Sequence, residues 1–232
     1  MSAIVEMLTA AGVFVVGLGA RLGIVVALMA VLLVPVLALA GGLKAARAVA
    51  LWAKGYRDAG GLKFRNGLRY APGHTWVKAE GNELKVGIDD LAQRMLPWTV
   101  GVKLPRAGQR VAEGEAVVRI SCGDREASVA APVAGTVVAV NPAVLREPTR
   151  VKSESYGSGW LFAIEPDGAG WKALPQGDAA RAWLAEEGER LTRFYERQLG
   201  FAAADGGDLV GPPPALLAEP QWKALLHAFL RT

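Results

Sequence analysis

The apolar and polar positions divide the chain into three parts of different character. The first part contains Leu22 to Leu43, a run of 22 residues without a charged side chain. A helix of this length, rising about 1.5 Å per residue, covers roughly 33 Å, enough to cross a hydrocarbon core of about 30 Å. The preceding apolar stretch, Met7 to Ala20, has 14 residues and is too short to span alone. We predict one transmembrane helix.

The middle part consists of short apolar runs punctuated by glycine and proline, with one short helix predicted from Asp90 to Met95 and capped by Asp89. The predicted strands are Thr75 to Ala79, Leu84 to Ile88, Thr99 to Leu104, Ala116 to Ile120, Glu126 to Ala130, Thr136 to Val140 and Trp160 to Ile164. Cys122-Gly123-Asp124 supplies turn chemistry between two of them. Many short strands at even spacing indicate a small sandwich or barrel.

The last part predicts two amphipathic helices. One begins at Asp178 and ends near Leu199, and the other begins near Pro220. The second has the i, i+3, i+4, i+7 pattern of apolar residues, formed by Trp222, Leu225, Leu226 and Phe229. Two interpretations stay open for this stripe: it packs on the middle domain, or it docks into another subunit, which makes Trp222, Leu226 and Phe229 candidate interaction residues.

The predicted fold class is α+β, with a single transmembrane helix, a β-rich domain and carboxyl-terminal helices. We place a transmembrane and basic juxtamembrane segment at residues 1–59. A β-rich domain follows at 60–174, after a linker at Gly60-Gly61, and a helical extension occupies 175–232. The distribution of charged residues along the chain adds to this division.

The net charge of +4 is unevenly distributed. Lys44 to Tyr70 holds seven basic residues against the single acidic Asp58, so the rest of the chain is slightly acidic. Because the positive charge is confined to this segment, the chain does not have the charge distribution of a nucleic-acid-binding protein. Because this basic run follows the apolar stretch, the positive-inside rule places the amino terminus outside and the main domain in the cytoplasm, on the inner membrane. The predicted interface residues, which meet membrane lipids, are Arg21, Lys44, Arg47 and Trp52.

Five blocks of the middle domain resemble the glycine cleavage system H protein family. They are Gly73 to Val77, Lys85 to Gln93, Leu104 to Gly114, Ala131 to Asn141 and Tyr156 to Phe162, in that order. The resemblance covers Tyr70 to Pro166. It implies a barrel-sandwich hybrid of the lipoyl- and biotinyl-carrier type. It also implies a hairpin tip at which the family carries a lipoyl arm, attached to a lysine, that visits several enzymes.

This chain departs from the family at that tip. Counted without gaps from Pro105 and from Pro132, the modified lysine falls at Asp124, and no lysine occurs from Leu104 to Val151. An aspartate cannot form the amide to lipoate. We therefore expect no lipoyl carrier activity and no cofactor.

Few other residues carry recognisable chemistry. Cys122 is expected on an exposed hairpin, where a thiol could replace the arm, although nearby Asp124 and Glu126 would raise its pKa rather than activate it. Cys122-Gly123-Asp124 is also a candidate surface for gripping a neighbouring subunit. One cysteine and two histidines leave a poor supply of metal ligands, and His74 is interpreted as structural. We expect neither a catalytic nor a metal site, and no enzyme.

The leading hypothesis is a non-catalytic, membrane-anchored scaffold or accessory subunit whose partners are other subunits of a membrane complex, for which a bioenergetic complex is one candidate. A first alternative is a lipoyl carrier or glycine-cleavage component with an unrecognised attachment site. A second alternative is an export adaptor of the membrane-fusion type, which the basic run and the missing coiled coil disfavour.

Overall fold

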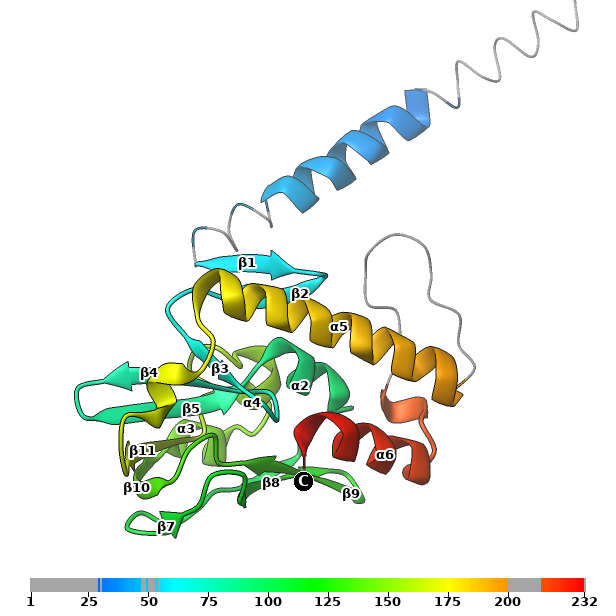
Figure 1. Ribbon diagram of the computed structural model, residues 1–232. Coiled ribbons are helices and arrows are strands. Elements are labelled where there is room, and N and C mark those ends of the chain that lie inside the picture. Colours follow the sequence, from blue (N-terminus) through cyan, green and yellow to red (C-terminus); the bar gives the residue numbers. More distant parts are fainter. Residues whose placement is uncertain are drawn as a thin grey trace, which may run out of the picture. The chain divides into compact units, whose positions relative to one another are not determined.

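The computed structural model describes residues 29, 31–46, 49, 53, 55–199 and 214–231. The chain divides into two compact units, Met1–Lys54 and Gly55–Thr232. In the first unit, residues 31–46 are helical, shown in blue in Figure 1, and their apolar side chains are exposed.

The predicted transmembrane helix falls on this first unit. No helix among the described residues is both long enough and apolar enough to cross a membrane. Since the predicted span begins at Leu22, part of it lies outside the described residues and it stays a prediction. Arg21, Arg47 and Trp52 also lie outside them, whereas Lys44 is helical and exposed.

The second unit is built on antiparallel sheets (Figure 1). The six-stranded sheet has the order β3 (Arg69–Ala71), β4 (Thr75–Glu80), β5 (Glu83–Ile88), β11 (Phe162–Pro166), β10 (Gly135–Val140) and β7 (Arg110–Val111). The three-stranded sheet has the order β6 (Gly101–Lys103), β8 (Ala116–Cys122) and β9 (Arg125–Ala130). The β-rich domain is confirmed, although the predicted strand Thr99 to Leu104 is shorter at both ends.

The core lies where the two sheets contribute buried side chains to one apolar cluster. In β8, alternation places Val118, Ile120 and Cys122 in the core, whereas Arg119 is exposed. The six-stranded sheet contributes Val86 to the same cluster. The alternating pattern thus decides which side chains of each strand are buried in the core and which are exposed.

A two-stranded hairpin precedes these sheets and corrects the predicted domain boundary. β1 (Tyr56–Ala59) pairs with β2 (Leu62–Arg65), and the Gly60-Gly61 pair forms the turn between them rather than a linker. Both glycines have positive φ, 62° and 79°, as a tight hairpin turn requires. The hairpin therefore belongs to the second unit, which begins at Gly55.

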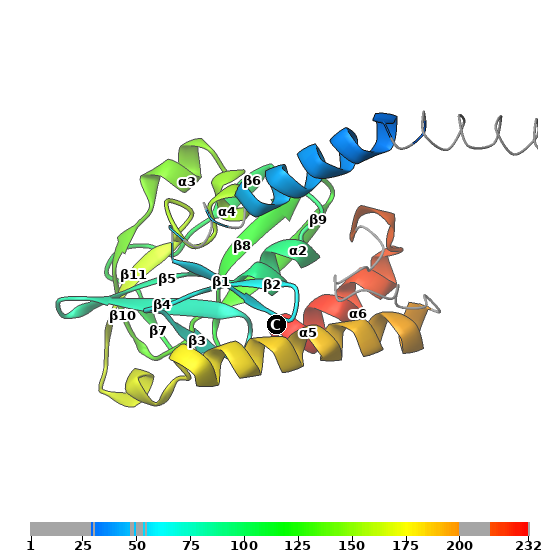
Figure 2. The same cartoon turned by 90° about the horizontal axis from the view of Figure 1, so that it is seen from above.

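Among the helices of the second unit, α2 (Asp90–Met95) begins at its predicted capping signal. It begins after Asp89, whose side chain accepts a hydrogen bond from the backbone N–H of Ala92. The remaining helical elements are α3 (Pro142–Arg146), α4 (Arg150–Ser153), η1 (Gly170–Ala173), α5 (Gly177–Leu199), η2 (Pro214–Leu216) and α6 (Glu219–Leu230). Figure 2 shows α5 running along one side of the unit, with α6 beside it.

The two last helices pack on the β-rich domain instead of forming a separate extension. Trp222, Leu226 and Phe229 of α6 are buried, at 0, 6 and 1 % exposure. The indole Nε1 of Trp222 donates to the carbonyl oxygen of Met95 in α2, at 3.0 Å. These side chains are therefore buried within the chain, as in the first of the two interpretations, in which the stripe packs on the middle domain.

Candidate functional site at the β8–β9 hairpin

The turn between β8 and β9 has two central residues, Gly123 and Asp124. Strand pairing continues to Cys122 opposite Arg125, directly below the turn. Gly123 has a φ of 74° and Asp124 a negative one, as in a type II′ hairpin turn. Asp124 therefore lies at the apex of the hairpin, with its side chain exposed.

The Asp124 carboxylate is free of partners in the structure. Within residues 55–199 and 214–231, no ion pair or hydrogen bond reaches it. Because the side chain is exposed, water solvates its charge. The position at which the family resemblance expects a lysine is thus an exposed, unpaired carboxylate.

Cys122 corrects the prediction of an exposed thiol. Its side chain is 0 % exposed, and its Sγ lies 3.9 Å from the carbonyl oxygen of Ile120, to which the thiol donates. Burial raises the pKa of the thiol to about 11, although the charges of Lys152 and Arg125 act in the opposite direction. The physical reason is alternation, because Cys122 continues the inward-facing series of β8. Cys122 is therefore neither a working thiol nor a contact residue.

Trp98 covers one side of the apex. A Cβ added to Gly123 would lie 3.2 Å from Nε1 of Trp98, so the indole rests directly against the turn. Behind it, the ammonium group of Lys152 donates to the carbonyl oxygens of Leu96 and Pro97. This arrangement fixes the segment that carries Trp98 next to Gly123.

Arg125 fixes the other side of the hairpin to the carboxyl-terminal region. Its guanidinium donates to the carbonyl oxygens of Leu217, at 2.8 Å, and Pro214, at 3.4 Å. It also pairs with Glu219 at 3.1 Å and lies 5.5 Å from the ring centre of Trp222. A planar guanidinium can satisfy several acceptors at once, and this one joins β9 to η2 and α6.

Sequence reasoning missed Arg125, although a signal was present. The register of β9 puts Arg125 on the same face as Ala127 and Val129, which are buried. A cation on a buried face requires acceptors from elsewhere in the chain. That requirement points to a long-range clamp without saying where the acceptors come from.

A second charged cluster surrounds His74, far from the hairpin apex in sequence. His74 is 1 % exposed; its Nδ1 lies 2.8 Å from Asp89 and its Nε2 lies 3.3 Å from Glu187 of α5. The ring stacks on Trp183 with a centroid separation of 5.2 Å. Burial lowers the pKa of His74, but Asp89 and Glu187 outweigh it and raise the value to about 9. The imidazolium is therefore held between two carboxylates at neutral pH.

Asp89 and the neighbouring Asp90 make structural contacts. Asp89 caps α2, and Asp90 accepts from the backbone of Lys63 at 2.9 Å and pairs with Arg94 at 2.8 Å. Both carboxylates thus hold structural contacts, and the predicted role of Asp89 as the cap of α2 is confirmed. His227 is exposed on α6. Among the described residues, no group of three or more potential metal ligands is close enough to hold an ion.

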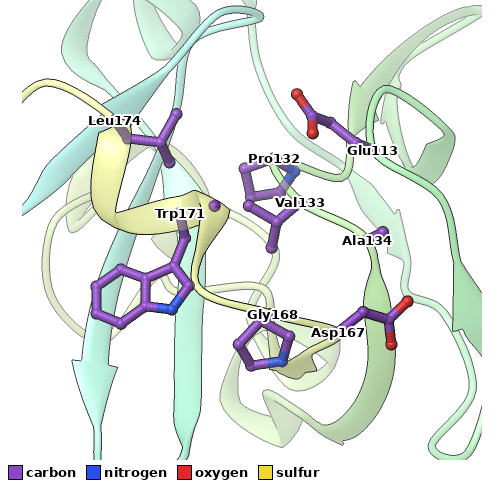
Figure 3. A pocket seen from close by; sticks show the side chains of 10 residues that line it. Glu113, Pro132, Val133, Ala134, Asp167, Gly168, Trp171 and Leu174 are labelled. Atoms are coloured by element: carbon purple, nitrogen blue, oxygen red, sulfur yellow. The ribbon is translucent and has the colours of Figure 1, made fainter.

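A shallow cavity of about 210 Å³ opens elsewhere on the unit, and Figure 3 shows its lining. It is formed around Pro132, Val133, Pro166 and Trp171. The labelled carboxylates do not converge on a common point in this view, and Asp167 is paired with Arg110 at 2.8 Å. No residue of the hairpin apex lines this cavity, so it is separate from the candidate site.

The second unit is an antiparallel β-rich domain whose β8–β9 hairpin ends in an exposed turn. The family model for the glycine cleavage H-protein matches residues 68–187, or 120 of the 232 residues, and the chain belongs to this family. The match includes the β8–β9 hairpin and ends at Glu187. β1, β2, η2 and α6 lie outside the match. The residues that contact Arg125, which come from η2, α6 and the segment between them, are therefore additions to the family domain.

Curated relatives support this membership. The chain is 36 % identical over 115 residues to a probable glycine cleavage system H protein of Aeropyrum pernix, covering 49 % of this chain and 80 % of the relative. It is 40 % identical over 97 residues to the glycine cleavage system H protein of Thermus thermophilus, covering 42 % and 76 %. A crystal structure of a glycine cleavage system H protein from Mycobacterium marinum aligns with 27 % identity and a TM-score of 0.47, over 52 % of this chain and 98 % of that chain.

Proposed function

We propose that this protein is a membrane-anchored, non-catalytic member of the H-protein family that acts as a scaffold or accessory subunit of a membrane complex. The observation that carries the proposal is the apex of the β8–β9 hairpin, where Asp124 is exposed at the position expected for a carrier lysine. A carboxylate cannot form the amide that attaches lipoate. The fold is retained without the group that a carrier needs.

The neighbouring lysines offer poor substitutes for an attachment site. No lysine occurs between Leu104 and Val151. Lys152 is half-buried, and its ammonium group is engaged by two backbone carbonyls. Lys103 lies on the edge strand β6, two residues past Gly101, which pairs with Ser121 near the hairpin end. None of these positions is at the tip of a hairpin.

The membrane part of the proposal rests on sequence. The uncharged run from Leu22 to Leu43 is long enough to span a bilayer, and the basic run that follows it favours a cytoplasmic location for the domain. A lipoyl shuttle that visits several enzymes has no need for such an anchor. We therefore assign the domain a fixed place at the membrane.

A second candidate is a component of glycine cleavage that uses another attachment site. It is favoured by the 36 to 40 % identity to proteins that carry the glycine cleavage system name. It differs from our proposal in one measurable property, covalent modification by lipoate.

Lipoylation of designed variants tests the proposal. We expect the full chain to stay unmodified by intact-mass spectrometry after incubation with a lipoate ligase, lipoate and ATP. Asp124→Lys should become modified, because it places a lysine at the exposed apex. Glu126→Lys, on the outward face of β9, is the matched control and should stay unmodified.

Each outcome separates the candidates. Modification of the wild-type chain would establish the second candidate and remove ours. A folded D124K chain that the ligase ignores would show that the apex does not correspond to the family's attachment position. For the anchor, release of the chain from membranes by alkaline carbonate would contradict an integral helix, and a carboxyl-terminal reporter active only outside the cytoplasm would contradict the orientation.

A further inference from the structure

Exposed apolar side chains gather around one feature of the second unit. Among the described residues 55–199 and 214–231, the exposed large apolar side chains are Trp98, Val100, Leu145 and Leu216, at 46, 60, 50 and 76 % exposure. Single exposed apolar residues are ordinary on a protein surface. What is informative here is that structural contacts tie three of them, Trp98, Val100 and Leu216, to the end of the β8–β9 hairpin.

Two of them lie on the β6 side of the hairpin. Trp98 rests against Gly123 in the turn, and the backbone N–H of Val100 donates to the carbonyl oxygen of Ser121, at 2.9 Å. Leu145 belongs to α3, which packs against β6, the strand paired with β8. The surface on the β6 side of the hairpin therefore has exposed apolar side chains.

The fourth lies on the opposite side. Leu216 ends η2, between Pro214 and Leu217, whose carbonyl oxygens both accept hydrogen bonds from Arg125. The clamp by Arg125 holds this exposed leucine beside the hairpin. Asp124, at the apex, thus has apolar side chains on both flanks.

We propose that this apex surface, formed by Trp98, Val100, Leu216 and Asp124, docks a protein partner that offers an apolar pocket and a lysine or arginine facing Asp124. The inference rests on the proposed accessory-subunit function and gives its partner a chemistry. Trp98 is the expected anchor. Aromatic side chains that fill a partner's pocket contribute a large share of binding energy, and the turn already orients this one.

The unpaired Asp124 carboxylate favours a protein partner over a lipid surface or a second copy of this chain. Anionic headgroups at the cytoplasmic leaflet would repel Asp124, so a lipid surface fits this site poorly. A second copy packed about a two-fold axis through the apex would bring two Asp124 carboxylates together. A partner with a basic residue pairs the charge and leaves the apolar flanks to be buried.

Site-specific crosslinking in native membranes tests the surface. A photoreactive amino acid replaces Leu216 in the full chain, and a matched control replaces Asn82, an exposed residue in the β4–β5 turn. We expect a crosslinked protein partner from position 216 and none from position 82. Trp98→Ser and Asp124→Arg should each lower the crosslinked yield about tenfold.

Charge exchange then identifies the contact. Reversing the partner's basic residue nearest the crosslink should restore binding to the D124R chain, and Glu83→Arg, on the β4–β5 hairpin, should have no effect on binding. Thermal melts of each variant establish that the domain is folded. Crosslinks from position 216 only to lipid, or only to a second copy of this chain, would overturn the proposal.

The outcomes also separate this surface from the accessory-subunit proposal. If the wild-type chain yields no partner from either position and purifies alone from mild detergent, the accessory function itself fails. If a stable partner co-purifies and W98S and D124R retain it, the function stands and the apex surface is wrong.

Discussion

The His74 cluster and the hairpin apex use charge in opposite ways. At His74, three charged side chains are paired with one another and largely withdrawn from water. At the apex, the Asp124 carboxylate is exposed and unpaired among the described residues. Breaking a buried pair is costly because a charge is left without compensation, whereas an exposed charge contributes little to folding. The comparison separates a cluster that stabilises the fold from a site that is free to meet a partner.

The strongest test of this contrast is removal of Asp89. Asp89→Ala takes away the cap of α2 and leaves the imidazolium of His74 with Glu187 alone. We expect a loss of about 3–5 kcal/mol in the free energy of unfolding, measured by urea titration. A loss below about 1 kcal/mol would show that the cluster is not a stabilising pair.

The pH dependence of stability sharpens the same point. The pKa of His74 is about 9 in the folded chain, against the ordinary histidine value of 6.5 that applies to an unfolded one. The stabilisation is therefore complete below pH 6.5 and is lost as the pH rises through 9, by up to about 3 kcal/mol. His74→Gln should flatten the profile of unfolding free energy against pH across this window. Glu187, whose pKa is lowered, acts only at acidic pH, outside this window.

Removal of the Arg125 clamp should have an intermediate effect. Arg125→Ala deletes the hydrogen bonds to Pro214 and Leu217 and the pair with Glu219, and we expect a loss of about 2 kcal/mol. Hydrogen exchange across residues 219–230 should accelerate. Arg119→Ala removes an exposed 3.6 Å pair with Glu126 and should change stability by no more than about 0.5 kcal/mol.

The smallest effect belongs to the apex. Asp124→Asn should alter the free energy of unfolding by less than about 0.5 kcal/mol, because the carboxylate has no partner to lose. Differential scanning calorimetry checks this. A drop comparable with that of Asp89→Ala would mean that the apex charge is structural, and the contrast would collapse.

Local patterns predicted much of the β-rich domain but not the contacts that join its distant parts. Alternation and turn residues identified most strands, and Asp89 was predicted as the cap of α2, because these features depend on neighbours in sequence. The burial of Cys122 lies outside the sequence prediction, because the predicted strand ends at Ile120 whereas β8 continues its alternation to Cys122. The pairing of His74 with Glu187 joins residues 113 positions apart, and periodicity carries no information on such pairs.

Arg125 shows why the candidate site was only partly predictable. The family resemblance located the turn and the expected attachment position, because both lie between two matched blocks, Leu104 to Gly114 and Ala131 to Asn141, that fix the register. The acceptors of Arg125 come from residues 214–219, outside the family match. Additions to a family domain follow no shared pattern, so their docking positions emerge only from the folded chain.

The hydrogen bond from Trp222 to Met95 has a consequence for biosynthesis. It joins α2 to α6 across 127 residues. At roughly 5–20 residues per second, translation of that interval takes roughly 6–25 s. During this time the surfaces of α2 and β9 that α6 later covers are open to the solvent. A chaperone or an early-binding subunit therefore meets a different molecule from the one present after synthesis, and α6 closes that surface last.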